Sequence, residues 1–318
     1  MRRRLYDICI IGGGALGLSV AKALSQKYPE RSIGLLEKSS KLCQHLSKRQ
    51  KGVLSSGGLS PPNSLKLKFC QSGKQQWESY CQEKNIKIEQ ISQFYIGQNA
   101  EANSKIEDLY NRSLANNAEM DLIEISRVKD LEPRIEHIDH NTMALHAQDS
   151  SIIDLDHALL ELKNDAQNLE NLEIVRNIQV SRVLKNSANG VELETFDTNS
   201  KSLFNKFQKY YSQKDLLESK IVINCAGLYS DRIARALGGA QAYGNLLVKA
   251  DFLNAKLEDL DNNFPKSTIY KVRSGQDLSL MREFISTFGN EVQFGPATGP
   301  ALWREMYDGI QNFSGRDF

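Results

Sequence analysis

Three glycines near the amino terminus have the spacing of a turn that binds a dinucleotide. They are Gly12, Gly14 and Gly17, in the stretch ICIIGGGALGL. In a strand–turn–helix unit, the first glycine makes the tight turn, the second lets the backbone approach a pyrophosphate, and the third lets the helix lie close to the strand. The start of the helix, with Ala15 and Leu16, then offers amides and a partial positive charge to the phosphates.

The same stretch also has features of an export signal, and only one of the two interpretations can hold. A basic start (MRRRLYD), an apolar run and the small residues of VAKA are typical of a cleaved signal. A signal does not require Asp7 before its apolar region or three glycines inside it. The next apolar segment, SIGLLEK, ends in Glu37, twenty positions after Gly17, where an acid accepts the hydroxyls of an adenosine ribose. We therefore interpret residues 6–37 as a nucleotide-binding β–α–β unit.

The composition is that of an ordinary globular protein that acts on small molecules. The chain has 318 residues, of which 40% are hydrophobic and 25% charged, with a formal net charge of +1. The balance of 40 basic and 39 acidic residues gives no general attraction to nucleic acid or anionic lipid. No uncharged apolar run reaches the ~18 residues of a membrane-spanning helix. We expect neither a nucleic-acid partner nor a transmembrane segment.

The five cysteines are scattered and odd in number. They show no CxxC spacing, which argues against a disulfide framework or a zinc site. We therefore expect no bound metal and a reducing compartment, cytoplasmic or mitochondrial. An apolar strand from about Leu5 leaves no room for a cleavable signal or presequence.

Beyond the first unit, helices and strands alternate. Nucleotide-binding features recur at the start, near 180 and near 225, with other material between them, so the domains are expected to be discontinuous. A solvated excursion is expected over 201–220. The expected helices cover 63–83, 101–116 and 154–168, and the expected strands include 94–97, 142–147, 172–185, 190–196, 221–227 and a hairpin at 283–296.

Six sequence blocks occur along the chain: IIGGGALGL, LLEK, GVLSSGGLSPPNSLKLKFC, ALHAQDSSIIDLDHAL, INCAGLYSDRIA and EVQFGPA. Their order and spacing resemble the D-amino-acid-oxidase (DAO) superfamily of flavoproteins, most closely its L-2-hydroxyglutarate dehydrogenase/oxidase branch. The resemblance implies an α/β (mixed α+β) fold, with a FAD-binding Rossmann-like domain of glutathione-reductase/DAO type and an interleaved antiparallel-sheet substrate domain. It assigns 1–85 and 145–240 to FAD binding, and 86–144 and 241–318 to the substrate or cap domain.

The resemblance also implies which residues hold non-covalent FAD. The glycine turn would hold the pyrophosphate, and Glu37, with Lys38 beside it, the adenosine ribose. A polar segment at 45–49 would line the pyrophosphate, the backbone of 52–54 would pass under the flavin, and the backbone of Val180 would meet the adenine. The full set is Gly12, Gly14, Ala15, Leu16, Gly17, Glu37, Lys38, His45, Ser47, Arg49, Gly52, Val53, Leu54, Val180, Ala226, Gly227 and Asp231.

The reaction that the resemblance implies is oxidation of a 2-hydroxy acid to the 2-oxo acid. A base takes the hydroxyl proton while hydride leaves the α carbon for the flavin, and a cation holds the carboxylate. Histidine suits the base because its pKa lies near neutrality. His146 is the candidate base and Arg282 or Arg304 the candidate cation, against the competing interpretations of a structural histidine and exposed charges. The remaining histidines, His137, His140 and His157, show no sign of a catalytic role.

Three features depart from the family. The relatives' HNSGVIHSG corresponds here to RQKGVLSSG, which places Gln50 and Lys51 where the relatives have asparagine and serine, and Ser55 where they have histidine. Glu283 stands at another histidine position of the relatives. The family continues beyond the segment that WREMYDGIQNF matches, so the resemblance implies a chain shortened at its carboxyl end.

These observations leave three functional hypotheses. The first is an active FAD-dependent oxidoreductase for a 2-hydroxy acid similar to L-2-hydroxyglutarate, with an undetermined electron acceptor. The second is a degenerate or truncated DAO-fold protein that acts as a non-catalytic structural or binding component. The third, a nicotinamide-dependent Rossmann enzyme, predicts a second nucleotide fingerprint or a catalytic pair, and neither occurs. A peripheral membrane or protein-complex association stays open on family analogy alone.

Overall fold

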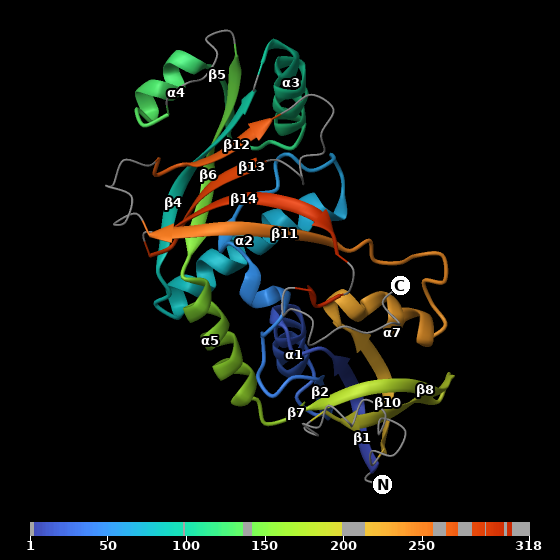
Figure 1. Ribbon diagram of the computed structural model, residues 1–318. Coiled ribbons are helices and arrows are strands. Elements are labelled where there is room, and N and C mark those ends of the chain that lie inside the picture. The colour runs from blue at the N-terminus through green and yellow to red at the C-terminus, as the bar shows by residue number, and fades with distance from the viewer. Residues whose placement is uncertain are drawn as a thin grey trace. The chain divides into compact units, whose positions relative to one another are not determined.

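The computed structural model describes residues 3–97, 99–135, 142–198, 214–256, 265–272, 282–289, 291–301 and 304–306. The chain has a mixed α/β fold made of two compact units, each with its own sheet (Figure 1). Unit 1 comprises residues 1–50 and 159–246, and unit 2 comprises residues 51–158 and 247–318. Each unit is therefore discontinuous in sequence.

The bounds of the two units differ from those predicted for the FAD-binding domain and the substrate or cap domain. Residues 51–85 and 145–158, assigned to FAD binding, lie in unit 2. The reason is strand pairing, because β3 (Val53–Leu54) and β6 (Met143–Ile153) are neighbours in the sheet of unit 2. The predicted division of roles itself stays a prediction.

The sheet of unit 1 has the strand order β7-β2-β1-β10-β9-β8. Strands β7, β2, β1 and β10 run parallel, and β9 and β8 continue the sheet in antiparallel fashion. The central part of the sheet is apolar, as strands covered on both faces must be: β2 is buried throughout, and Cys9, Ile10 and Leu35 are fully buried. The bounds are β1 (Arg3–Ile11), β2 (Ile33–Glu37), β7 (Leu172–Arg176), β8 (Ile178–Ser187), β9 (Gly190–Asp197) and β10 (Lys214–Asn224).

Helix α1 (Ala15–Lys27) joins β1 to β2 and packs on them through Leu18 and Ala21. A core cluster that includes Cys9 and Ile11 also contains residues of β8 and β9, and Ile233 of α7 (Ser230–Ala236) packs against it. These contacts hold the carboxyl end of β1, where the glycine turn begins, in a fixed place. Unit 1 also contains η1 (Leu46–Arg49), η2 (Gly227–Tyr229) and most of α5 (Leu155–Gln167).

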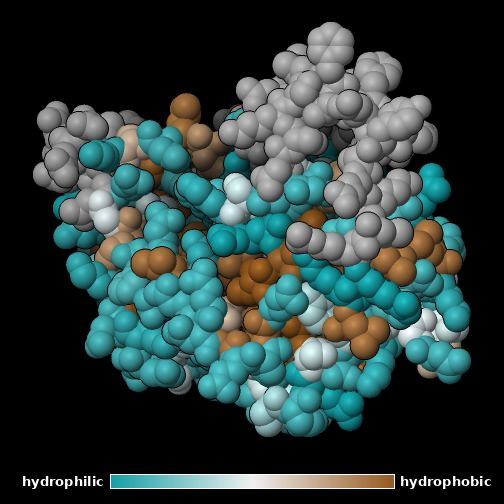
Figure 2. All heavy atoms as spheres, turned by 90° about the horizontal axis from the view of Figure 1, so that it is seen from below, coloured by the Kyte–Doolittle hydropathy of each residue, from teal (hydrophilic) through white to brown (hydrophobic). Residues whose placement is uncertain are grey.

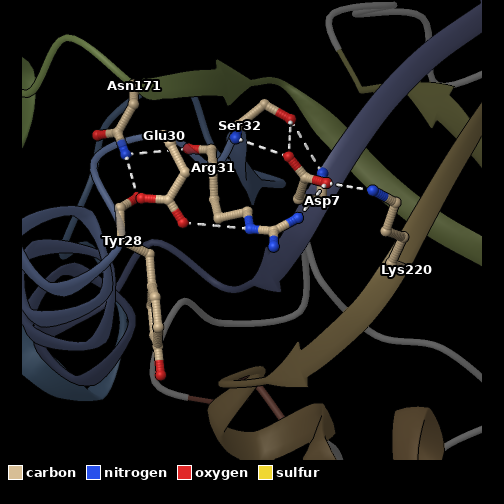
Figure 3. A network of polar contacts seen from close by, with 7 residues as sticks. All are labelled: Asp7, Tyr28, Glu30, Arg31, Ser32, Asn171 and Lys220. Atoms are coloured by element: carbon tan, nitrogen blue, oxygen red, sulfur yellow. Dashed lines mark hydrogen bonds and ion pairs between the residues drawn. The ribbon is translucent and has the colours of Figure 1, made fainter.

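Within β1, Asp7 ties three chain segments together (Figure 3). Its Oδ1 accepts a hydrogen bond from Lys220 Nζ at 2.6 Å, and its Oδ2 accepts one from the Ser32 amide at 3.0 Å. Arg31 Nη1 lies 3.5 Å from the same Oδ1. The Lys220 ammonium, followed by the Ser32 amide, holds the pKa of Asp7 well below its usual range. Asp7 therefore stabilises the fold in its ionised form.

Replacing Asp7 by asparagine should lower the Tm at neutral pH by about 2–4 °C. Because folding lowers this pKa, the contribution is present above the pKa of the unfolded chain, near 3.9, and disappears as the pH falls toward the folded value. Thermal unfolding from pH 7 to pH 3 should show a constant difference in Tm down to about pH 4 and a difference that begins to narrow below it. Asp130→Asn, in an exposed ion pair with Arg127, is the matched control and should behave as wild type. A gap between Asp7→Asn and wild type that is no smaller at pH 3 than at pH 7 would contradict this assignment.

The sheet of unit 2 has the order β11-β14-β13-β12-β4-β6-β3, with β5 paired to β6. All its pairings are antiparallel except that of β12 with β4. The bounds are β3 (Val53–Leu54), β4 (Ile88–Gly97), β5 (Met120–Glu124), β6 (Met143–Ile153), β11 (Val248–Lys256), β12 (Thr268–Val272), β13 (Arg282–Thr287) and β14 (Glu291–Pro300), with helices α2 (Leu65–Glu83), α3 (Ala100–Ala115) and α4 (Ile125–Leu131).

Helices α3 and α4 lie at the same end of this sheet, on opposite faces (Figure 1). Alternate residues of β6 point to opposite faces, and Leu145 packs in a cluster with α3 whereas Ala144 packs in a cluster with α4. Helix α2 packs near the other end, through Cys81, against Ile153. The sheet is therefore covered on both faces at the end that carries α3 and α4.

Candidate dinucleotide site

The turn between β1 and α1 leaves no room for side chains at two of its glycines. A Cβ atom on Gly17 would lie 1.9 Å from the carbonyl oxygen of Gly12, and one on Gly12 would lie 2.3 Å from the carbonyl oxygen of Cys225. Gly12 also has a φ of +113°, which side chains disfavour. The first and third glycines therefore provide the tight turn and the close helix that the motif predicts.

Gly14 is different, because the space beside it is filled only by a side chain. It is the residue before α1, and a Cβ there would meet Ser47 Oγ at 2.9 Å. The same hydroxyl accepts a hydrogen bond from the Ala15 amide at 2.9 Å. The first-turn amides of a helix have no acceptor within the helix, and the first turn of α1 carries no acidic residue. This cradle, with amides directed at an oxygen atom, fits a phosphate group.

Glu37 lies beside the turn, at the carboxyl end of β2. Its side chain is buried, with Oε2 accepting a hydrogen bond from the Gly13 amide at 2.8 Å and Oε1 accepting one from the Ser39 amide at 2.7 Å. Each carboxylate oxygen can accept a second hydrogen bond. The carboxylate is thus fixed beside the glycines and keeps the capacity to accept a ribose hydroxyl.

The other predicted residues in the first part of unit 1 contact their own surroundings. Lys38 Nζ lies 4.2 Å from the centre of the Tyr229 ring, and His45 Nε2 lies 3.1 Å from Ser39 Oγ. Arg49 Nη1 donates to the carbonyl oxygens of Gln44, at 2.6 Å, and His45. Arg49 thus folds back on its own segment, and a role at the pyrophosphate stays a prediction.

The later predicted residues of unit 1 lie along β8 and after β10. Val180 and Ala226 pack against the core cluster that contains Cys9 and Ile11. Gly227 has a φ of +53° with open space around its Cα. Asp231 is buried, and its Oδ2 accepts hydrogen bonds from Arg235, at 2.8 Å, and from the Asn245 amide. The glycines, Glu37 and Ala226 thus lie at the carboxyl ends of three strands, β1, β2 and β10, on the same side of one sheet.

The predicted flavin loop belongs to unit 2. Gly52 has a φ of +70°, and its carbonyl oxygen accepts a hydrogen bond from the Ile153 amide at 2.9 Å. A Cβ on Gly52 would lie 2.8 Å from the Ile153 carbonyl oxygen. Val53 and Leu54 form β3, paired with β6. The predicted FAD residues are therefore divided between the two units.

His146 lies inside β6, between β4 and β5. Its ring stacks on Phe94 with 4.6 Å between centroids, and its Nε2 lies 3.1 Å from Ser92 Oγ. Burial lowers the pKa of His146, while the nearby Asp121 opposes the shift. The imidazole is therefore neutral at neutral pH and packed into the sheet, and a catalytic role for it stays a prediction.

Replacing His146 by phenylalanine should flatten the pH dependence of stability between pH 7 and pH 5. As the pH decreases from 7 to 5, His146 takes up a proton in the unfolded wild-type chain but resists protonation in the folded chain. The free energy of unfolding therefore decreases as the pH decreases, by up to about 1.4 kcal/mol per pH unit. Urea unfolding of the variant should lack this slope, while Ser92→Ala, which keeps the imidazole, should retain it. If His146→Phe keeps the wild-type slope but abolishes flavin reduction, the structural assignment is wrong and the histidine is catalytic.

Of the two arginines that could bind a carboxylate, the structure describes the side chain of Arg304 but not that of Arg282. Arg282 is the first residue of β13 and pairs through its backbone with Lys271, and its side chain lies outside the described part. Arg304 is only 8% exposed, so the interpretation of this residue as an exposed charge is wrong. His137 and His140 lie outside the described residues, as does the side chain of Glu283.

The surface seen in Figure 2 is mostly hydrophilic, with apolar residues in limited areas. Within the described residues, no helix is both long and apolar enough to cross a membrane. The same residues contain no group of three or more histidine, cysteine or acidic side chains placed to hold a metal ion. All five cysteines are free.

Known proteins match the chain over most of its length. Residues 7–303 match the DAO family, described as FAD dependent oxidoreductase. The mitochondrial L-2-hydroxyglutarate dehydrogenase of Pongo abelii is 30% identical over 309 residues, which are 95% of this chain and 69% of that protein. The L-2-hydroxyglutarate dehydrogenase of Salmonella houtenae is 26% identical over 303 residues, 95% of this chain and 66% of that protein. The chain spans 63% to 69% of the length of three such relatives.

Solved structures show the same fold at lower identity. Dithionite-reduced L-α-glycerophosphate oxidase from Mycoplasma pneumoniae with FAD bound aligns with a TM-score of 0.77 at 20% identity, over 95% of this chain and 74% of that chain. Glycine oxidase from Geobacillus kaustophilus aligns with a TM-score of 0.72 at 13% identity, over 94% and 72%. The predicted fold class and the resemblance to FAD enzymes are both confirmed. The chain therefore belongs to the DAO family of FAD-dependent oxidoreductases.

Proposed function

We propose that this chain uses FAD to oxidise a 2-hydroxy acid, of the class to which L-2-hydroxyglutarate belongs, to the corresponding 2-oxo acid. The observation that carries the proposal is the cradle at Gly14, where the amide end of α1 and the fixed carboxylate of Glu37 lie beside one turn. Relatives with about 30% identity over nearly the whole chain are L-2-hydroxyglutarate dehydrogenases, which supports the substrate class.

In this proposal, the residues of unit 1 hold the dinucleotide end of FAD. The first-turn amides of α1 bind the pyrophosphate, with Ser47 moving aside or sharing the contact, and Glu37 accepts the ribose hydroxyls. Glycines at 12 and 17 keep the turn close enough for the backbone itself to make these contacts. The other predicted residues, from Lys38 to Asp231, remain part of the proposed site.

The bound flavin supplies the acceptor for a hydride from the α carbon of the substrate. The protein must then supply a base for the hydroxyl proton and a cation for the carboxylate. His146 and Arg282 are the sequence-based candidates for these roles in unit 2. The neutral imidazole of His146 has the protonation state that a base needs, because burial lowers its pKa.

The test is the spectrum of the purified protein during anaerobic addition of 2-hydroxy acids. We expect non-covalent FAD, restored by incubation with FAD where it is lost, and bleaching of the oxidised flavin by L-2-hydroxyglutarate but not by its D enantiomer. Reoxidation by oxygen or by a quinone then identifies the electron acceptor. A protein that FAD cannot reconstitute would refute the cofactor site, and a flavoprotein that no 2-hydroxy acid bleaches would favour a non-catalytic component.

A further inference from the structure

On the face of the unit 2 sheet that carries α3, a group of polar side chains lies beside the apolar cluster. Tyr95 in β4 pairs with Leu145 of this cluster and with Tyr270 in β12, and the two tyrosine rings stack with 4.6 Å between centroids. Two residues before each tyrosine, Gln93 pairs with Thr268. Residues two apart in a strand share a face, and paired residues lie side by side on it. These four polar side chains therefore form one group.

A β-bulge in β6 brings further polar side chains to the same face. Gln93 pairs with Ala147, but Ile91, two residues earlier in β4, pairs with Ser150, so β6 carries one extra residue here. Without the extra residue, Ser150 would lie on the opposite face of the sheet. Bulges re-aim the side chains beside them and are frequent next to active sites. The bulge thus adds Ser150 to the polar group, with Asp149 directly before it.

Asp149 contacts Lys74 of α2. Lys74 Nζ lies 3.9 Å from Asp149 Oδ2 and donates a hydrogen bond to the Asp149 carbonyl oxygen. Burial, followed by Tyr270 and Asp149, raises the pKa of Tyr95 well above its usual range, so the Asp149 carboxylate lies near the tyrosines. The side chains of Asp149 and Lys74 are 13% and 18% exposed, so solvent reaches this end of the polar group.

Three buried polar atoms of this group have no hydrogen-bond partner among the described residues. They are Asp149 Oδ1, Ser150 Oγ and Thr268 Oγ1, and Ser150 and Thr268 are only 1% and 0% exposed. Folded proteins satisfy nearly all buried polar atoms, and those without a protein partner bind water, an ion or a ligand. Three such atoms on β6 and β12, the two neighbours of β4, indicate a site for a polar ligand.

The unpartnered atoms define the chemistry of this ligand. Asp149 Oδ1 is an acceptor, whereas the Ser150 and Thr268 hydroxyls can donate. The complementary molecule carries a hydroxyl beside a carboxylate, which is the arrangement in a 2-hydroxy acid. The Lys74 ammonium offsets the charge that a second carboxylate brings near Asp149. Thr268 lies two strands away from Asp149, at roughly 10 Å, so the far carboxylate of a short dicarboxylate can reach it.

We propose that the substrate binds on this face and that Asp149, in place of His146, is the base. His146 pairs with Phe94 on the opposite face of the sheet, so only one of the two residues can contact the substrate hydroxyl. Asp149 Oδ1 takes the proton as the O–H bond breaks, and the hydride leaves the α carbon for the bound flavin, so the acid is oxidised and FAD is reduced. The assignment rests on the proposed function and adds Ser150 and Thr268 as carboxylate contacts.

The first experiment measures binding without turnover. The FAD-loaded protein is photoreduced and kept anaerobic, so that it cannot accept a hydride, and is titrated with L-2-hydroxyglutarate or glutarate in a calorimeter. The two acids differ only in the hydroxyl that donates to Asp149. We expect Asp149→Ala, in which Lys74 keeps Glu78 at 3.7 Å, to reduce the preference for L-2-hydroxyglutarate about 10- to 100-fold. An unchanged preference, or a wild type that binds neither acid, overturns the proposal.

Asp121→Ala is the matched control for this substitution. Asp121 pairs with His146 on the opposite face, where its Oδ2 accepts a hydrogen bond from Gln148 at 2.6 Å. This variant should keep the wild-type preference for L-2-hydroxyglutarate. A loss of preference as large as that of Asp149→Ala would place the hydroxyl on the other face and overturn the proposal.

Thr268→Val tests the far carboxylate. It removes an unpartnered hydroxyl at nearly constant volume, so the fold should be retained. The affinity for both dicarboxylates should fall about 10-fold, whereas the affinity for L-lactate, which has no second carboxylate, should stay the same. Unchanged affinity for the dicarboxylates overturns the contact with Thr268.

The second experiment measures the rate of flavin reduction by L-2-hydroxyglutarate. Asp149→Asn keeps the shape of the side chain but not the base, so the limiting rate should fall about 100-fold or more, and Asp149→Glu should recover part of it. A wild-type limiting rate in Asp149→Asn overturns the proposal while the proposed function stands. If no acid reduces the wild-type flavin but Asp149→Ala still changes the binding preference, the proposed function fails and the binding site stands.

Discussion

Replacement of Gly17 by alanine should lower the free energy of unfolding of unit 1 by about 3 kcal/mol or more. The new methyl group would lie 1.9 Å from the Gly12 carbonyl oxygen, and this oxygen belongs to the backbone of the turn, so it cannot move aside cheaply. Helix α1 would have to shift away from β1 and lose the packing of Leu18 and Ala21. Urea unfolding followed by circular dichroism measures the loss.

Gly73→Ala is the matched control for this substitution. Gly73 also lies inside a helix, α2, but a Cβ there meets nothing within 4 Å. Since glycine is unfavourable in helices, the control should be neutral or more stable by about 0.5–1 kcal/mol. Similar stability of the Gly17→Ala and Gly73→Ala proteins would mean that the turn is not packed as described.

Gly14→Val should lower the affinity for FAD by about 100-fold or more, while leaving the protein folded. The residue has a φ of −79° in the extended region, which any side chain can adopt. Its Cβ would meet only the movable hydroxyl of Ser47. The valine side chain would, however, fill the space beside the first-turn amides, where the pyrophosphate is proposed to lie. Titration of apoprotein with FAD, followed by flavin fluorescence, measures the change.

Ser47→Ala is the control that reports on the same place without filling it. It removes the acceptor of the Ala15 amide and leaves that donor available to a phosphate oxygen, so FAD binding should persist. Wild-type affinity in Gly14→Val would show that the pyrophosphate lies elsewhere. Loss of folding in Gly14→Val would show that Ser47 is not movable.

The glycine turn and Glu37 could be predicted from the sequence because their signals are local. The glycine spacing, the apolar strand before it and the position of Glu37 all lie within one β–α–β unit, and the structure places them at one sheet edge. Two hydrogen bonds could not be predicted: the one from the Gly13 amide to Glu37, and the one from the Ala15 amide to Ser47. Both depend on where a loop returns in space, which no residue spacing encodes.

The sequence-based predictions that are wrong failed for the same reason, because they depend on contacts between residues that are far apart in the sequence. The strand expected at 221–227 begins earlier, at Lys214, because Lys214–Ser219 pair with β9, so the solvated excursion expected over 201–220 is wrong from that point on. The excursion's remaining residues, up to 213, lie outside the described part. The burial of Arg304 likewise has no local signal.

The reductive half-reaction of the FAD-loaded protein tests directly whether this chain oxidises a 2-hydroxy acid. Rapid anaerobic mixing with L-2-hydroxyglutarate should remove the oxidised-flavin absorbance in one turnover and yield one equivalent of 2-oxoglutarate. Deuterium at the α carbon should slow the bleaching, because that carbon donates the hydride. Bound FAD that stays oxidised with this acid and with every other 2-hydroxy acid would contradict the account.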